Sequence, residues 1–111
     1  MDTLNQYRQI IRNVIEHYAQ FVPALGEVQI ERIFDETNDH YELIYAGWNG
    51  IHRIHGSVLH LDIRDGKVWI QHDGTEDGIA EELVEAGIPR EHIVLAFKHP
   101  ELRPHTDFAV A

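Results

Sequence analysis

Two hairpin turn sequences, Asn49-Gly50 and Asp65-Gly66, divide a stretch in which apolar and polar residues alternate. Both turn positions must accept a positive φ, which glycine, asparagine and aspartate tolerate. Alternation with a period of two predicts strands that bury one face and leave the other exposed to solvent. Consecutive hairpins of this kind form an antiparallel meander. The strands we expect are at about 40–48, 51–64 and 67–72.

A further strand precedes these three. Its apolar residues, Val28, Ile30, Ile33 and Phe34, alternate imperfectly, which indicates a bulge. The polar run 35–39 predicts the turn that joins this strand to the next.

Residues 4–22 predict a helix, because apolar residues recur there at a spacing of three to four. These residues are Leu4, Tyr7, Ile11, Val14, Tyr18 and Phe21. Pro23 ends the helix, since proline disfavours helical geometry in the residue before it.

A second, shorter helix is expected at about 74–86, with Asp73 and Glu76 at the spacing of a capping box. Gly87 suits the left-handed residue that follows a helix. The apolar run 93–97 fits either a short strand or one buried turn. The expected fold class is α+β, with an antiparallel meander sheet of about four strands, an N-terminal helix and a second shorter helix after the sheet.

The chain has 111 residues and 43% hydrophobic residues, which fits a single domain spanning 1–111. It has no cysteine, which excludes disulfides, thiolate nucleophiles and cysteine-based zinc sites. No stretch approaches the ~20 apolar residues of a membrane-spanning helix. We expect a soluble, cytoplasmic protein.

Nine basic and nineteen acidic residues give a net charge of −10 with histidine neutral. DNA affinity rests largely on lysine and arginine at the phosphates, so direct high-affinity nucleic-acid binding is not expected. The charge favours a basic protein partner, or it serves solubility alone.

Nine histidines raise the question of a metal site. His60 and Asp62 share one strand face, and strict alternation adds His52 to that face. On a straight strand, however, positions 52 and 60 lie about 26 Å apart, so another element would have to complete the site. We therefore interpret these residues as solvent-facing and expect no metal and no cofactor.

No catalytic motif emerges. Asp65-Gly66-Lys67 has the acid-any-lysine spacing of metal-dependent nucleases, but Asp-Gly between two alternating runs is typical of a hairpin. Ser57, the only serine, lies inside a predicted strand. We expect no catalytic residues and no enzymatic activity.

The strongest candidates for a binding surface are acidic or C-terminal. Between Val68 and Pro89 every charged residue is acidic. The candidate partner-binding residues are Asp77, Glu81, Glu82, Glu85, Phe108 and Val110. A charge run is also typical of a solvated helix face, and the apolar C-terminal residues can equally pack on their own domain or on a second copy in a homo-oligomer.

Several segments, in order, resemble the XisI family. They are His55-Gly56-x-x-Leu59-His60-x-Asp62-Ile63, Asp65-Gly66-Lys67-x-Trp69-Ile70-Gln71, Asp73-Gly74-Thr75-Glu76-x-Gly78-Ile79-Ala80, Gly87-Ile88-Pro89, Ile93-Val94-Leu95 and Thr106-Asp107-Phe108-Ala109-Val110-Ala111. Together they cover nearly the whole chain.

The resemblance implies an accessory protein that controls excision of the fdxN element, a DNA rearrangement during heterocyst development in cyanobacteria. It implies an XisH-like partner from a family that resembles restriction-type nucleases, and a separate recombinase for strand exchange. It supplies no catalytic residues. Two hypotheses follow: a regulatory protein that binds an XisH-like protein or a site-specific recombinase, or, as the alternative, a metal-binding or enzymatic protein that uses the histidine-rich sheet face.

Overall fold

The computed structural model describes residues 3–21 and 26–111. Within these ranges the elements follow in the order α1 (Thr3–Tyr18), β1 (Glu27–Asp35), β2 (His40–Asn49), β3 (His52–Arg64), β4 (Lys67–Asp73), α2 (Ala80–Ala86), the 3-10 turn η1 (Arg90–His92), β5 (Ile93–Leu95) and the 3-10 turn η2 (Arg103–His105). None of the described helices is long and apolar enough to cross a membrane.

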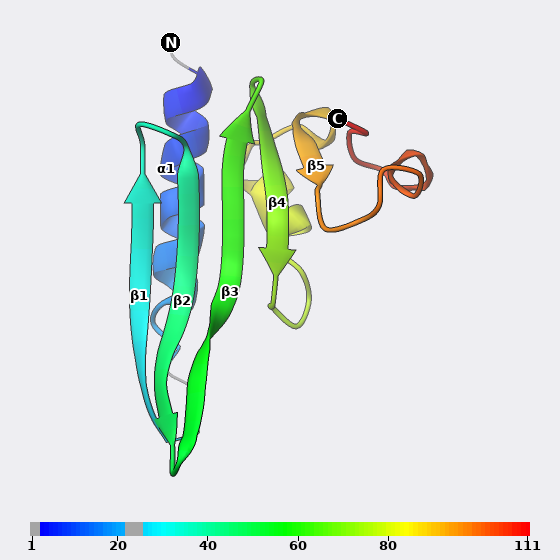
Figure 1. Ribbon diagram of the computed structural model, residues 1–111. Coiled ribbons are helices and arrows are strands. Elements are labelled where there is room, and N and C mark those ends of the chain that lie inside the picture. Colours follow the sequence, from blue (N-terminus) through cyan, green and yellow to red (C-terminus); the bar gives the residue numbers. More distant parts are fainter. Residues whose placement is uncertain (1–2, 22–25) are drawn as a thin grey trace.

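The strands form one sheet in the order β1-β2-β3-β4-β5 (Figure 1). The first four are antiparallel neighbours, as the hairpin turns predict. The fifth lies parallel to β4, with Ile93 opposite Val68. The α+β prediction is therefore confirmed, and the run left open between strand and buried turn is a fifth strand.

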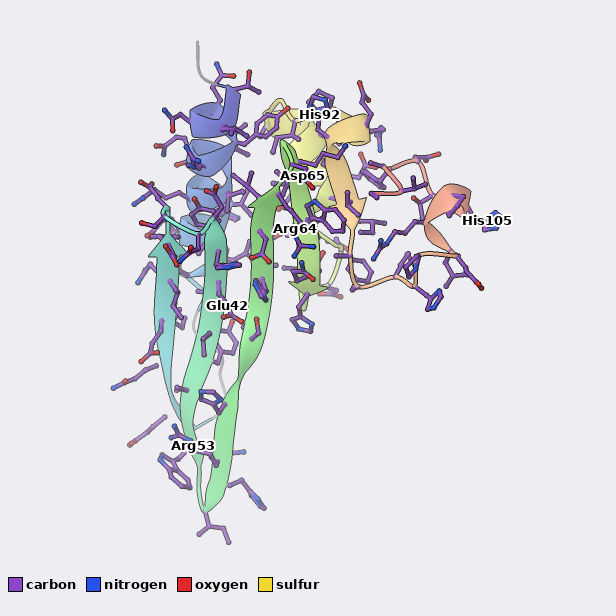
Figure 2. The ribbon with its side chains drawn as sticks, turned by 45° about the horizontal axis from the view of Figure 1, so that its top comes forward. Glu42, Arg53, Arg64, Asp65, His92 and His105 are labelled. Atoms are coloured by element: carbon purple, nitrogen blue, oxygen red, sulfur yellow. The ribbon has the colours of Figure 1, made fainter. Side chains whose placement is uncertain are left out.

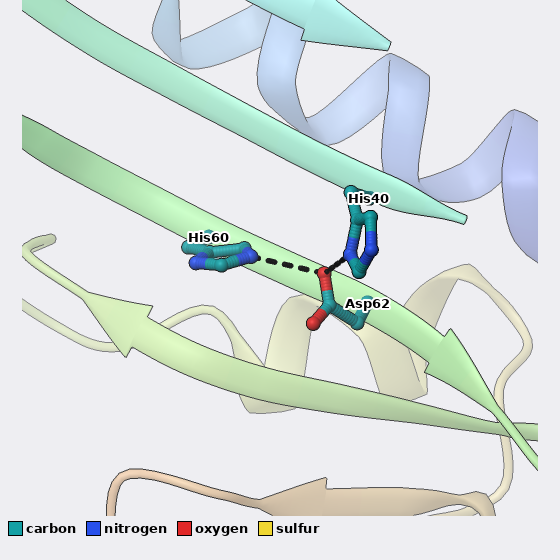
Figure 3. A group of neighbouring side chains, drawn as sticks. All are labelled: His40, His60 and Asp62. Carbon is teal, nitrogen blue, oxygen red and sulfur yellow. Dashed lines mark hydrogen bonds and ion pairs between the residues drawn. The ribbon is translucent and has the colours of Figure 1, made fainter. Parts of the chain in front are cut away.

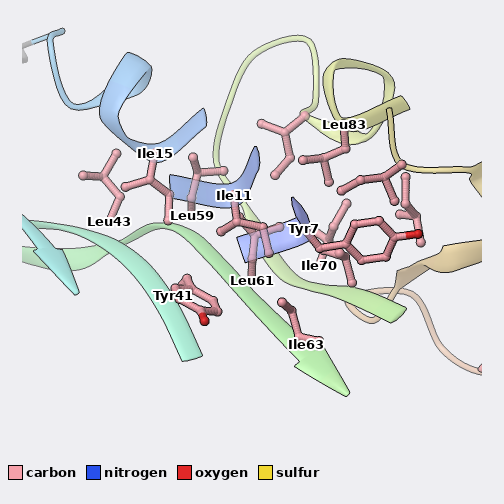
Figure 4. Close-up of a cluster of buried hydrophobic side chains, with 14 of the residues drawn as sticks. Tyr7, Ile11, Ile15, Tyr41, Leu43, Leu59, Leu61, Ile63, Ile70 and Leu83 are labelled. Atoms are coloured by element: carbon pink, nitrogen blue, oxygen red, sulfur yellow. The ribbon is translucent and has the colours of Figure 1, made fainter. Parts of the chain in front are cut away.

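The helices α1 and α2 lie on the same side of the sheet (Figure 1). The buried side of α1 carries Tyr7, Ile11 and Ile15, which face the apolar residues of the sheet (Figure 4). Those sheet residues are Tyr41, Leu43, Leu59, Leu61, Ile63, Val68 and Ile70. Each fully buried side chain of this size contributes about 1.5–3 kcal/mol. This face is called the covered face below, and the opposite one the open face.

The predicted turns occur with one shift. Asp65 (φ 53°) and Gly66 (φ 78°) form the β3–β4 hairpin as expected. In the β2–β3 hairpin Asn49 pairs with His52, so the turn is Gly50 and Ile51, one residue later than the Asn-Gly sequence predicts.

The bulge predicted in β1 is absent, because β1 pairs with β2 without a register shift. The imperfect alternation has another cause: Ile33 stands opposite Glu42 and is 40% exposed, so it is an apolar residue away from the core. The irregularities lie instead in the next two ladders. Pairing skips Val58 on β3 and Gln71 on β4, and each extra residue reverses the alternation beyond it.

The predicted ends of α1 and the start of α2 need correction. Regular helix ends at Tyr18, and turn hydrogen bonds carry the chain to Phe21. The predicted boundary at residues 22 and 23 lies outside the described residues.

The second helix begins at Ala80 and not near residue 74, because Asp73 organises a loop in place of a capping box. Its Oδ1 accepts a hydrogen bond from Thr75 N (3.0 Å) and its Oδ2 one from Ile79 N (2.8 Å). Gly78, at φ 79°, turns the chain between these contacts. Glu76 is exposed and plays no part in a cap.

A polar cluster joins α1 to the β1–β2 turn. Arg8 of the helix donates to both oxygens of Asp39, at 2.8 and 3.2 Å, and the Tyr41 hydroxyl donates to Oδ1 at 2.8 Å. The hydrogen bond from Arg8 lowers the pKa of Asp39, against an opposing effect of burial, and the one from Tyr41 adds to it. The cluster holds the helix over the covered face.

We expect Asp39→Asn to cost about 1–3 kcal/mol at pH 7, where the carboxylate is ionised and accepts charged hydrogen bonds. Because the folded-state pKa lies below the unfolded value, the contribution is present above about pH 4 and is lost as the pH falls through the folded pKa. Urea unfolding at a series of pH values measures it. Asp65→Asn is the matched control, since Asp65 also has a positive φ and is exposed. A difference between wild type and Asp39→Asn that does not change with pH would contradict the assignment.

Candidate functional site

The acidic segment, residues 73–86, is only partly free of contacts. Glu81 is exposed, but its two oxygens accept hydrogen bonds from Arg90 at 2.6 and 2.7 Å. Glu82 is partly buried and accepts a hydrogen bond from the Tyr18 hydroxyl at 2.8 Å. The solvated helix face, the alternative interpretation of this charge run, is therefore wrong for Glu82, because α1 lies close enough to bond it.

Three carboxylates of the segment are free. Glu76, Asp77 and Glu85 are exposed, and within the described ranges they make no side-chain hydrogen bond or ion pair. Burial, and then the hydrogen bond and the charge of Glu82, raise the pKa of Tyr18 to about 12. The negative charge available to a partner is thus at the loop before α2 and at the helix end, not along the whole helix.

A groove of about 490 Å³ lies beside two of these carboxylates. Its lining combines aromatic and aliphatic side chains from α1, β2 and β3 with the loop after β4: Tyr18, Phe21, Tyr45, Val58, Gly74, Thr75, Glu76 and Asp77. Phe21 is 57% exposed at its edge. An apolar floor with an acidic rim suits a peptide that carries both apolar and basic side chains.

The C-terminal tail docks on its own domain. Ala109 N donates to Ile93 O at 2.8 Å and forms a parallel bridge with Val94. Phe108 is partly buried against the core, with the Arg90 guanidinium 5.5 Å from its ring centre. Val110 is 52% exposed. Of the two candidate tail residues, Phe108 is used within the domain and Val110 remains accessible.

Two histidines and one carboxylate converge on the open face. His40 Nδ1 and His60 Nε2 lie 2.8 and 2.9 Å from the same oxygen, Oδ1 of Asp62 (Figure 3). Asp62 is 5% exposed and is the single buried charged residue in the described part of the chain. The hydrogen bond to Asp62, and then the charge of that carboxylate, raises the pKa of His40.

Sequence reasoning placed His60 and Asp62 together correctly but paired them with His52. The bulge at Val58 reverses the alternation, so His52 turns to the other side of the sheet, opposite Asn49 at the hairpin end. The third member is instead His40, the cross-strand partner of Asp62 on β2. His40 depends on the register of β2 against β3, which the extra residue at Val58 sets and the hairpin turn alone does not.

Some of the basic residues are paired with carboxylates, and others gather around Trp69. Arg8, Arg12, Arg32 and Arg90 each pair with a carboxylate, which accounts for four of the nine lysines and arginines. Arg53 lies near the β2–β3 turn and Arg64 at the opposite end of β3 (Figure 2). Arg64 and Arg103 both lie over the ring of Trp69, at 4.8 and 5.6 Å from its centre, and Arg64 pairs with Lys67 across the β3–β4 hairpin. Four basic residues are therefore neutralised locally, and part of the remaining positive charge lies around Trp69.

Comparison with known proteins agrees with the resemblance drawn from the sequence. Residues 1–110 match the family model described as XisI protein. The chain belongs to the XisI family. No curated protein matches it.

Solved XisI structures share the whole fold. A XisI-like protein from Anabaena variabilis is 37% identical, with a TM-score of 0.91 over 99% of this chain and 100% of the other. The fdxN element excision controlling factor XisI from the same organism is 39% identical, with a TM-score of 0.88 over 99% of this chain and 100% of the other. The XisI-family domain thus has the same extent in all three.

Within this XisI-family domain, Glu82 and Glu85 should respond differently to charge reversal. We expect Glu82→Lys to lower the free energy of unfolding by about 1–3 kcal/mol, because it removes the acceptor of the Tyr18 hydroxyl. Glu85→Lys, its exposed neighbour on α2, should change it by less than about 0.5 kcal/mol. Chemical denaturation measures both, and equal effects would show that the Tyr18 contact contributes nothing to stability.

Proposed function

We propose that this XisI-family chain is an accessory factor that controls a DNA excision and catalyses no strand exchange itself. The observation that carries the proposal is the likeness, over the full length of both chains, to a protein named fdxN element excision controlling factor XisI. Cyanobacterial heterocyst development, where the fdxN element is excised, is the setting that this name supports.

The regulation is proposed to run through protein contacts and not through DNA. A net charge of −10 repels a phosphate backbone at long range. Four arginines are committed to ion pairs on the domain's own surface. These pairs reduce the positive charge that a DNA phosphate would meet, so a protein partner suits the surface better.

The docking surface is proposed to comprise the free carboxylates before α2 and at its end, Glu76, Asp77 and Glu85, called the acidic patch here, together with the groove beside Glu76 and Asp77. Exposed like charges attract a basic partner and raise its association rate. The aromatic floor of the groove, Tyr18, Phe21 and Tyr45, can anchor an apolar side chain of that partner. An XisH-like protein or a site-specific recombinase with a basic surface is the partner we propose.

The test is calorimetry with a purified XisH-like protein at two salt concentrations. We expect the triple variant Glu76→Lys, Asp77→Lys, Glu85→Lys to bind about tenfold more weakly or worse and to lose much of its salt dependence, because rim charges set both. None of the three side chains holds the fold, so circular dichroism and unfolding should be unchanged.

The matched control carries the same change of charge elsewhere: Glu27→Lys, Glu31→Lys, Glu101→Lys, all exposed and distant in sequence from the acidic segment. We expect it to retain most of the affinity. If both triple variants weaken binding equally, net charge and not this patch governs association. If neither does, the acidic patch has no part in the function.

A further inference from the structure

The cluster of His40, His60 and Asp62 has the composition of a metal site. Each residue offers one ligand atom, and these atoms lie within 4.8 Å of one another. Two imidazole nitrogens and a carboxylate oxygen are ligands that suit zinc and neighbouring transition metals, whereas calcium and magnesium prefer oxygen ligands alone.

Two of the three spacings between ligand atoms are close to those around a bound ion. Around an ion with bonds of about 2.0–2.1 Å, neighbouring ligand atoms stand roughly 2.9–3.4 Å apart for angles between octahedral and tetrahedral. The two nitrogens are 2.8 and 2.9 Å from Asp62 Oδ1. The two nitrogens are within 4.8 Å of each other, so the exposed imidazole of His40 would have to turn to bring all three atoms into this range around an ion.

An outer hydrogen bond orients one of the three ligands, as in established metal sites, and a carboxylate lies near a second. His60 turns Nε2 toward Asp62, and its other nitrogen, Nδ1, lies 4.0 Å from the carboxylate of Glu42. Gln71 Nε2 lies 3.3 Å from Oδ2 of Asp62, the oxygen that faces away from the histidines. The bulge at Gln71 places this amide, because pairing of β3 with β4 skips that residue.

The three candidate ligands differ in burial, which decreases from Asp62 through His60 to His40. The side chain of Asp62 is 7% exposed, that of His60 33% and that of His40 55%. An ion bound here would have its anionic ligand shielded and one side open to water or to a ligand from another molecule. Three protein ligands with an open position are typical of zinc sites that bind an exchangeable group.

We propose that His40, His60 and Asp62 bind one divalent transition-metal ion of the zinc type on the open face of the sheet. This proposal revises the expectation of no metal, because that expectation considered the distance between ligands on one straight strand. That argument excluded His52 and required another element to complete the site; β2 is that element, and its His40 completes the set. The proposal is independent of the acidic patch.

The test is titration of the chelator-treated protein with ZnCl₂ by calorimetry. We expect one ion per chain and affinity at least about tenfold weaker in His40→Ala and in Asp62→Asn, since loss of even an outer contact costs 10–100-fold. The matched control is His52→Ala, because His52 is an exposed histidine on β3, the strand of Asp62. This variant should bind zinc as the wild type does. Thermal melting with and without zinc should show a shift in wild type and in His52→Ala that His40→Ala lacks.

Cobalt gives a second readout that scattered surface histidines would not reproduce. Co²⁺ bound by these imidazole and carboxylate ligands should show a visible d–d band that His40→Ala abolishes. His40 is more than half exposed, so this variant should fold even if Asp62→Asn does not. Absence of zinc binding below millimolar concentration, or equal loss in His40→Ala and His52→Ala, would overturn the proposal.

Discussion

The packing of α1 on one face of the sheet is the interaction on which the rest of the structure depends. Ile11 and Ile15 are completely buried against residues such as Leu59 and Leu61. Because successive strand residues point to opposite faces, every second side chain lies on that face and the others lie on the open face. The same pattern that folds the chain therefore presents His40, His60 and Asp62 on the opposite side.

Much of this follows from the sequence, and the exceptions have physical causes. The hairpins and α1 were predictable because turn chemistry and periodicity are local, and the family was indicated by the resemblance of its motifs. The register of β2 against β3 was not. The turn alone would set Tyr41 opposite His60, which would bury a polar residue, and the extra residue at Val58 moves the pairing to Leu61. Burial decided the register, and with it the partner of Asp62.

The contacts of the acidic segment on the surface were likewise not predictable from the sequence. Composition predicted a run of carboxylates without a cation, but it could not show that Arg90 and Tyr18 come from outside the run to bond Glu81 and Glu82. The start of α2 was misplaced for a related reason, since Asp73 bonds Ile79 across the loop. Contacts between segments thus leave Glu76, Asp77 and Glu85 as the free charge, a smaller and better defined patch than the sequence indicates.

Hydrogen–deuterium exchange of the complex with an XisH-like protein tests most directly whether this patch is the interface. Binding should slow exchange in peptides that cover residues 74–86, while the β2–β3 hairpin end, where Ile51 is 90% exposed, exchanges as in the free protein. Protection confined to residues 47–54, with 74–86 unchanged, would contradict the account.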